Sequence, residues 1–132
     1  MNSKAKGETT EAVVLAYFVS RGCAVLVPFG NNQRYDLVID RDGILVKGQC
    51  KTAVYRSGVL VFNAHNTNGF TGKSRGYRGQ VDVFWVYAPH TKHVYEVPVA
   101  DVGETQVSLR VDPPKRGPNR PSIRWAKAYE LP

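Results

Sequence analysis

The first strong pattern along the chain is a continuous helix-compatible run close to its start. From Glu8 to Ser20 the residues are apolar on nearly every side, and neither glycine nor proline interrupts them. Arg21 and Gly22 follow, and a glycine after an apolar run is a common helix stop. We therefore expect a buried first helix over Glu8–Ser20.

Short runs rich in β-branched and aromatic residues follow and predict strands. Two of them, Tyr35–Asp40 and Ile44–Thr52, are separated by the tight-turn sequence Arg41-Asp42-Gly43, so we expect a hairpin. The other strand candidates are Ala24–Pro28, Gly58–Phe62, Val81–Tyr87, His93–Val97 and Gln106–Val111. One helix followed by many strands predicts an α/β fold, as a single domain over residues 1–132 with a central mixed β-sheet flanked by helices.

Two segments interrupt this pattern and are expected to be irregular. Asn63–Gly79 is rich in glycine and asparagine and carries Lys73, Arg75 and Arg78, so we interpret it as a long basic loop. Asp112–Pro121 is rich in proline and basic residues, which predicts an irregular connection on the surface.

The charge balance adds an expected partner. Lys and Arg total 18 against 11 Asp and Glu, which gives a formal net charge of +7. Such an excess suits a polyanion, because each neutralised phosphate of a nucleic acid releases condensed counterions. A basic protein without a nucleic-acid role has the same composition, so charge alone does not decide.

Cysteine usage and hydropathy suggest where the protein acts. Cys23 and Cys50 both lie in apolar runs, and no clustered His or further Cys completes a zinc site with them. The start of the chain lacks the apolar core of a signal peptide, and no stretch approaches the ~20 apolar residues of a membrane span. We expect an intracellular, cytoplasmic protein with reduced cysteines.

Strand alternation brings several polar residues of the hairpin together. In the second hairpin strand, Lys47, Gln49 and Lys51 share one face. Asp36 lies near the start of the first hairpin strand, and this start is adjacent to the end of the second strand in an antiparallel pair. Asp36, Gln49 and Lys51 are therefore expected to converge, although an edge strand with a solvated face would show the same alternation.

Glu11 is the polar residue that the predicted helix places unusually. At 100° per residue it falls in the stripe formed by Val14, Leu15 and Phe18, which is otherwise the packing face. A buried carboxylate needs a partner, and either Lys51 or a divalent cation would serve. An acid near a helix start also interacts favourably with the helix dipole, and Glu8 is the competing candidate.

These groups would suit phosphodiester hydrolysis. Two carboxylates, Glu11 and Asp36, and the amide oxygen of Gln49 form an all-oxygen set that fits Mg²⁺, with Mn²⁺ able to substitute. A bound metal activates water and neutralises charge, and Lys51 beside it would stabilise the phosphate as charge develops. We predict Glu11, Asp36, Gln49 and Lys51 as catalytic residues, the first three as metal ligands.

The order of these residues resembles a known family. Lys6-Gly7-x-x-x-Glu11, Arg34-Tyr35-Asp36 and Gln49-Cys50-Lys51 resemble the motifs of the PD-(D/E)XK nuclease superfamily. The opening motif and small size look most like archaeal-type Holliday junction resolvases, and next most like compact intron-associated homing endonucleases. The resemblance covers about residues 4 to 53. It departs from the pattern at Tyr35, where the family has proline, and at Gln49, where most members have an acid.

The resemblance implies a restriction-endonuclease-like fold and a homodimer that cuts branched DNA with Mg²⁺. It implies Glu11, Asp36 and the residue at 49 as ligands and Lys51 as the catalytic cation. Gln49 in place of an acid leaves open whether one or two metal ions bind. The basic residues expected to contact DNA are Lys4, Lys6, Arg34, Lys73, Arg75 and Arg78.

Three functions are therefore weighed. The first is a metal-dependent, structure-specific endonuclease that resolves Holliday junctions in DNA recombination and repair. The second is a sequence-specific homing or restriction-type endonuclease whose loops at 63–79 and 112–121 read base edges. The third is a catalytically inactive DNA-binding module that retains the fold.

Overall fold

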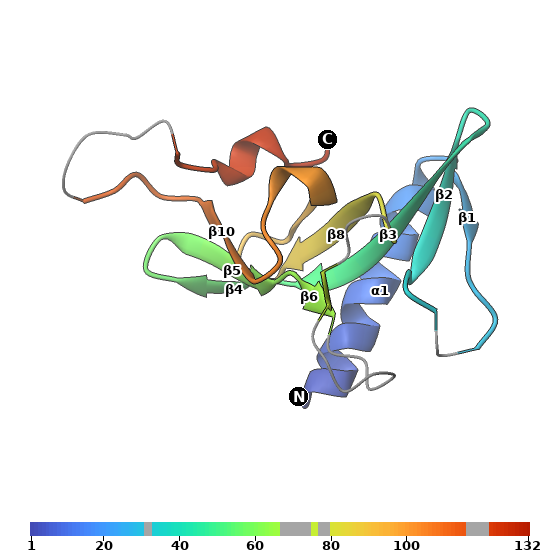
Figure 1. The fold of residues 1–132 in the computed structure, drawn as a ribbon, viewed down its shortest axis with the longest axis horizontal. Helices are drawn as coiled ribbons and strands as arrows, with labels where there is room; N and C mark the ends of the chain where they lie inside the picture. Colours follow the sequence, from blue (N-terminus) through green and yellow to red (C-terminus); the bar gives the residue numbers. More distant parts are fainter. Residues whose placement is uncertain (31–32, 67–74, 77–79, 116–121) are drawn as a thin grey trace.

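The chain begins with a capped helix, α1, which spans Ser3–Ser20 in a computed structural model (Figure 1). It starts at Ser3 rather than at the predicted Glu8, because the Asn2 side chain accepts a hydrogen bond of 2.8 Å from the Ala5 backbone N–H. It ends before Gly22, which has a φ of +81°. The structure describes the chain except residues 31–32, 67–74, 77–79 and 116–121. No helix in the described ranges is long and apolar enough to cross a membrane.

Five strands form the main sheet, in the order β1-β2-β3-β8-β9. Only β3 and β8 pair in parallel, so the sheet is mixed, as predicted. The predicted hairpin is β2 and β3, and Asp42 and Gly43 turn with φ values of +52° and +89°. The strands are β1 (Ala24–Leu26), β2 (Leu37–Arg41), β3 (Ile44–Thr52), β8 (Val83–Ala88) and β9 (His93–Pro98).

The connection between the parallel strands β3 and β8 contributes two strands, β4 and β5, to a second sheet, and β10, which follows β9 in the chain, completes it. Its antiparallel strands follow the order β10-β5-β4. Part of the segment predicted as a long loop forms a third, two-stranded sheet of β6 and β7. The bounds are β4 (Val54–Arg56), β5 (Val59–Asn63), β6 (His65–Asn66), β7 (Arg75–Gly76) and β10 (Gln106–Arg110), with 3-10 turns at Val99–Asp101 and Ala126–Ala128.

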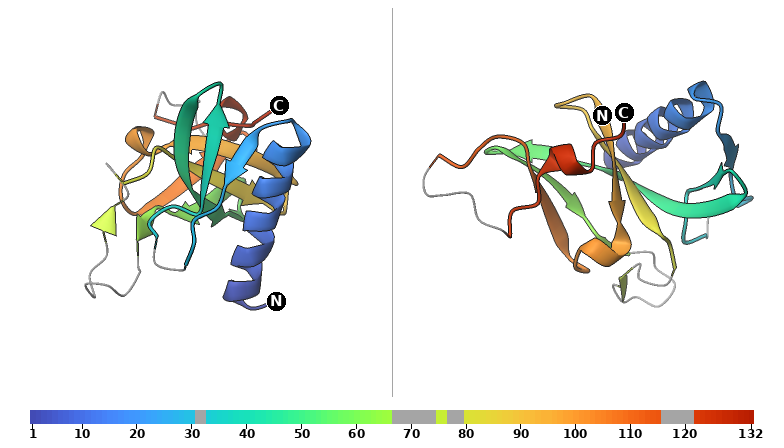
Figure 2. Two further views of the ribbon diagram at one scale, coloured as in Figure 1. Left: turned by 90° about the vertical axis from the view of Figure 1, so that its right-hand side faces the viewer. Right: turned by 90° about the horizontal axis from the view of Figure 1, so that it is seen from above.

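The main sheet is covered differently on its two faces, as Figure 2 shows from two further sides. On one face, Val14 and Phe18 of α1 pack in a cluster with Trp85. On the other face, Phe84 and Leu60 belong to a cluster shared with the three-stranded sheet. The α/β class and the mixed central sheet are confirmed, but in the described residues a second sheet, and not a helix, covers the second face. A helix and a second sheet can each bury the apolar side chains of a strand. The pattern of apolar residues along the strand therefore does not reveal which of the two covers it.

Gly48 of β3 packs directly against the ring of Trp85 in β8, which belongs to the core cluster beneath α1. A Cβ atom at position 48 would lie 2.3 Å from the Trp85 ring. Trp85 is fully buried, and its indole N–H donates a 2.8 Å hydrogen bond to Glu96. Glu96 in turn forms a two-point ion pair with Arg41. The glycine therefore makes room for a ring that is held in place from its other side.

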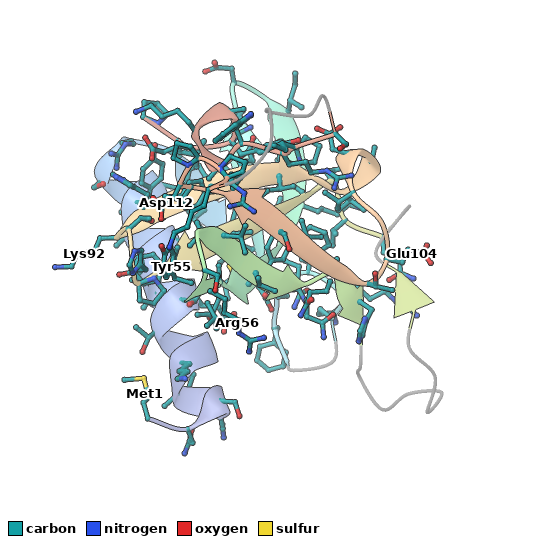
Figure 3. All side chains as sticks on the ribbon, turned by 90° about the vertical axis from the view of Figure 1, so that its left-hand side faces the viewer. Met1, Tyr55, Arg56, Lys92, Glu104 and Asp112 are labelled. Carbon is teal, nitrogen blue, oxygen red and sulfur yellow. The ribbon has the colours of Figure 1, made fainter. Side chains whose placement is uncertain are left out.

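An aromatic contact joins the second sheet to the main one. The Tyr55 ring of β4 stacks on His90, with ring centroids 3.8 Å apart and planes inclined by 10°. The Tyr55 hydroxyl donates a hydrogen bond to Asp112, which lies beside it in Figure 3. These contacts tie the turn between β8 and β9 to both edges of the second sheet.

Candidate active site

Asp36 lies immediately before β2, one residue outside the strand in which it was predicted. Its backbone N–H donates to the Gly48 carbonyl at 2.9 Å. Its carboxylate Oδ2 accepts a 2.7 Å hydrogen bond from the Cys50 backbone N–H. Asp36 therefore binds β3 just beyond the last residue pair of β2 and β3, and these two hydrogen bonds to the backbone of β3 fix its position.

Glu11 reaches the same place from α1. It is half-buried and lines a cavity of about 410 Å³ together with Asp36. We call these two carboxylates the acid pair and their cavity the acid-pair cavity. The remaining walls come from the segment between β1 and β2, which provides Val27, Pro28, Gly30, Gln33 and Tyr35.

Burial shifts the pKa of both members of the acid pair, and neighbouring charges modify each shift. Burial raises the pKa of Glu11, and the charges of Asp36 and Glu8 raise it further. Burial also raises the pKa of Asp36, although the hydrogen bond from Cys50 and the charge of Lys51 lower it in part. Both carboxylates thus hold their protons more tightly than ordinary acids do. A cation bound between them would favour the ionised form of each.

Lys51 approaches Asp36 from the second face of the main sheet. Its Nζ lies 5.9 Å from the centre of the Phe84 ring, which belongs to the core between the two sheets. Burial lowers the pKa of Lys51, and the charge of Asp36 raises it in part. The half-buried ammonium group and the carboxylate of Asp36 therefore interact electrostatically.

Three of the four predicted catalytic residues are brought together. Glu11 and Asp36 share a cavity, and Lys51 interacts with Asp36. Gln49 is half-buried, two residues before Lys51 in β3, but it is not among the residues that line the acid-pair cavity. Glu8, the competing acid, contributes its charge to Glu11 but does not line the cavity either.

The helix stripe differs from the prediction at Glu11. The buried positions of α1 are Thr10, Val14 and Phe18, so Glu11 lies beside this stripe rather than at its centre. Thr10 is held by its hydroxyl, 2.6 Å from that of Thr52 in β3. This contact holds the part of α1 from which Glu11, the next residue, reaches the cavity beside Asp36 at the start of β2.

The predicted DNA-contacting residues fall into two groups. Lys4 and Lys6 are exposed near the start of α1, and Arg34 is exposed two residues before Asp36. The second group belongs to the basic segment that follows β5. Lys73 and Arg78 of this group lie outside the described residues, and so does the side chain of Arg75, whose backbone is in β7.

Part of the site was not found by sequence reasoning. The amide of Cys50 holds Asp36, but every residue except proline carries such a donor, so no residue type marks it. Gln33 and Tyr35 also line the cavity. Their closeness to Asp36 in the sequence is the one weak sign that could have predicted this position.

The donor chemistry of the acid pair fits a hard divalent cation. Two carboxylates facing one cavity are the usual protein ligands of such ions. Within the described ranges, no three His, Cys, Asp or Glu side chains gather as a complete metal site. Further oxygen ligands would therefore have to come from an amide, a backbone carbonyl, water or the substrate.

Comparisons with known proteins agree with this chemistry. A bacterial homing endonuclease, I-Ssp6803I, has a similar solved structure, with a TM-score of 0.76 and 26% sequence identity over 98% of this chain and 89% of that one. Among curated proteins no sequence match is found. The family model of the PD-(D/E)XK endonucleases, which generally use divalent metal ions, matches residues 1–132. The chain therefore belongs to the PD-(D/E)XK endonuclease family and is a nuclease.

Proposed function

We propose that this nuclease is a sequence-specific endonuclease of the homing or restriction type, which cuts duplex DNA with Mg²⁺ as a homodimer. The observation that carries the proposal is the extent of the likeness to a homing endonuclease, which covers 98% of this chain. That likeness includes the half of the chain after Thr52. Substrate choice depends on this half, because the catalytic half is common to nucleases with different substrates.

Sequence reasoning favoured a Holliday junction resolvase and kept the homing or restriction type as the alternative. The family match supports a nuclease of either kind. The structural neighbour is a homing endonuclease, and none of the comparisons supports junction resolution. The alternative is therefore the better supported of the two.

We assign the acid pair as the main metal ligands, with the Gln49 amide oxygen as a further candidate ligand. Mg²⁺, when bound, supplies an activated water and neutralises charge on the phosphate. Asp36 is oriented for this role by the Cys50 backbone N–H. Lys51 donates hydrogen bonds to the scissile phosphate and stabilises its developing charge, because its burial strengthens the interaction.

The remaining basic groups would position the DNA. Lys4, Lys6 and Arg34 are exposed and therefore able to contact DNA phosphates. A two-fold dimer presents two active sites, one for each strand of a duplex. The net charge of +7 favours the encounter with DNA at low salt.

The test offers the protein two kinds of DNA, with Mg²⁺ and with EDTA. One is a library of linear duplexes with randomised centres, sequenced after cleavage, and the other is a set of four-way junctions of varied sequence. We expect Mg²⁺-dependent cleavage of duplexes that share one sequence. Cleavage of junctions whatever their sequence, with the duplexes intact, contradicts the proposal. Tight binding without cleavage by any divalent ion would indicate an inactive module instead.

A further inference from the structure

A run of large apolar side chains is exposed where β1 ends. Leu26 is 45% exposed, Val27 66% and Phe29 100%. Single exposed apolar residues are common, but an uncovered phenylalanine beside two further exposed apolar residues indicates a contact surface. We call Val27 and Phe29 the apolar rim.

The apolar rim borders the acid-pair cavity. Val27, Pro28 and Gly30 line that cavity together with Glu11 and Asp36, so Phe29 lies between residues that form its wall. Figure 1 shows the segment between β1 and β2 running beside the N-terminal half of α1. Phe29 is not itself among the lining residues, and its exposed ring lies on the surface beside this wall, where an occupant that extends over the wall would meet it.

The local backbone keeps Phe29 on the surface. Pro28 restricts the chain just before it, and Gly30 just after it has a φ of +92°, which other residues rarely adopt. The turn thus directs the phenyl ring away from both core clusters, neither of which includes it. The exposure of Phe29 follows from the turn that holds it.

Duplex DNA is the occupant that these observations favour. A duplex with one phosphate at the acid pair would place neighbouring bases near the apolar rim, because Val27 of the rim lines the same cavity as Glu11 and Asp36. Phenylalanine is one of the side chains that proteins insert against base steps, where it partly unstacks them. We propose that Phe29 is an apolar wedge that packs against the base pairs beside the scissile phosphate. This inference rests on the proposed function.

The first experiment places a fluorescent reporter at the rim. Phe29→Trp is titrated with a mixed-sequence linear duplex in EDTA, and the emission of the parent protein is subtracted. We expect quenching by the bases and protection from acrylamide as DNA binds. The matched control is Ile44→Trp, at a 70% exposed apolar position at the other end of β3, which should show neither effect.

The second experiment measures affinity by fluorescence anisotropy. Phe29→Ala should bind the same duplex about tenfold more weakly, because the variant loses the stacking of an aromatic side chain on a base. Phe29→Trp should restore most of the affinity, and Ile44→Ala should leave it unchanged. Thermal unfolding of all four variants checks that the fold is intact.

Two results would overturn the wedge while leaving the proposed function in place. One is DNA binding or cleavage at the parent level by Phe29→Ala, together with an indole emission of Phe29→Trp that DNA leaves unchanged. The other is a change in that emission with protein concentration in the absence of DNA, since the rim would then contact a second copy of the chain. Failure of the parent protein to bind any DNA would instead overturn both proposals.

Discussion

At the scale of single residues, the acid pair makes the metal-free protein sensitive to pH. Burial raises the pKa of both Glu11 and Asp36, and the charge of Asp36 adds to the shift of Glu11. Raised carboxyl pKa values mean that the folded state binds protons more tightly than the unfolded chain does. The ionised acid pair therefore destabilises the metal-free fold, and a divalent cation would remove this effect.

The acid pair predicts a direction for stability against pH. In EDTA, the free energy of unfolding of the parent protein should fall as pH rises from about 4, the pKa of an ordinary carboxyl group, through the raised pKa values. In Asp36→Asn the free energy of unfolding should decrease less with pH, so this variant should be more stable than the parent at neutral pH. Urea unfolding across this pH range measures both effects.

Two controls accompany this measurement. Asp42→Asn, at the exposed turn between β2 and β3, should keep the pH dependence of the parent. Added Mg²⁺ should stabilise the parent at neutral pH but not Asp36→Asn, because only a ligand that binds the folded state stabilises it. A parent protein that gains stability relative to Asp36→Asn as pH rises in EDTA contradicts this account.

Sequence reasoning reached these residues to different degrees. Asp36 and Lys51 followed from strand alternation in a hairpin with a clear turn, and the structure places them within electrostatic reach of each other. Glu11 followed from its unusual position in an apolar helix, although it lies beside the buried stripe. The role of Gln49 remains a prediction. Strand alternation indicates the face on which a side chain lies, but it does not indicate whether that side chain reaches a cavity at the end of a neighbouring strand.

At the scale of elements, the contact between β3 and β8 depends on Gly48. The Trp85 ring fills the space where a side chain at 48 would be, and it cannot move outward because it is buried and bonded to Glu96. Glycine is usually unfavourable inside a strand, so its presence here reflects the close approach of the ring. The register of β3, and with it Lys51, depends on this contact.

Gly48→Ala should therefore destabilise the protein. Forcing an extra carbon into a filled core costs about 1–3 kcal/mol, and the rigid indole gives no easy relief. The control is Gly7→Ala, because a Cβ there meets nothing within 4 Å. It should stabilise α1 by roughly 0.5–1 kcal/mol. Urea unfolding measures both, and an unchanged stability of Gly48→Ala would refute the packing argument.

The elements themselves were largely predictable, and their partners were not. The helix, the hairpin and the later strands followed from periodicity and turn residues. The parallel pairing of β3 with β8 did not, because 30 residues separate Thr52 from Val83 and no local pattern records such a pairing. The start of α1 was missed because its first turn is stabilised by the Asn2 cap rather than by apolar residues.

At the scale of the whole molecule, the proposed dimer makes a prediction about strand breaks. When the parent chain and Asp36→Asn are refolded together, mixed dimers carry one intact and one disabled site. They should nick the selected duplex in one strand, whereas parent dimers break both strands. Gel analysis of a supercoiled plasmid carrying the site separates nicked from linear product. If the mixed refolding yields less linear product than the parent and no nicked plasmid, the proposal of one active site per strand is contradicted.

The most direct test of the central claim compares two lysines of one strand. Lys47 and Lys51 lie in β3 on the same alternating face, but only Lys51 interacts with Asp36. With Mg²⁺ and the selected duplex, Lys51→Ala should reduce the cleavage rate roughly a hundredfold or more, since it removes a group that stabilises developing charge. Lys47→Ala should cleave at nearly the parent rate, and both variants should bind DNA. Equal cleavage by Lys51→Ala and the parent would contradict the assigned active site.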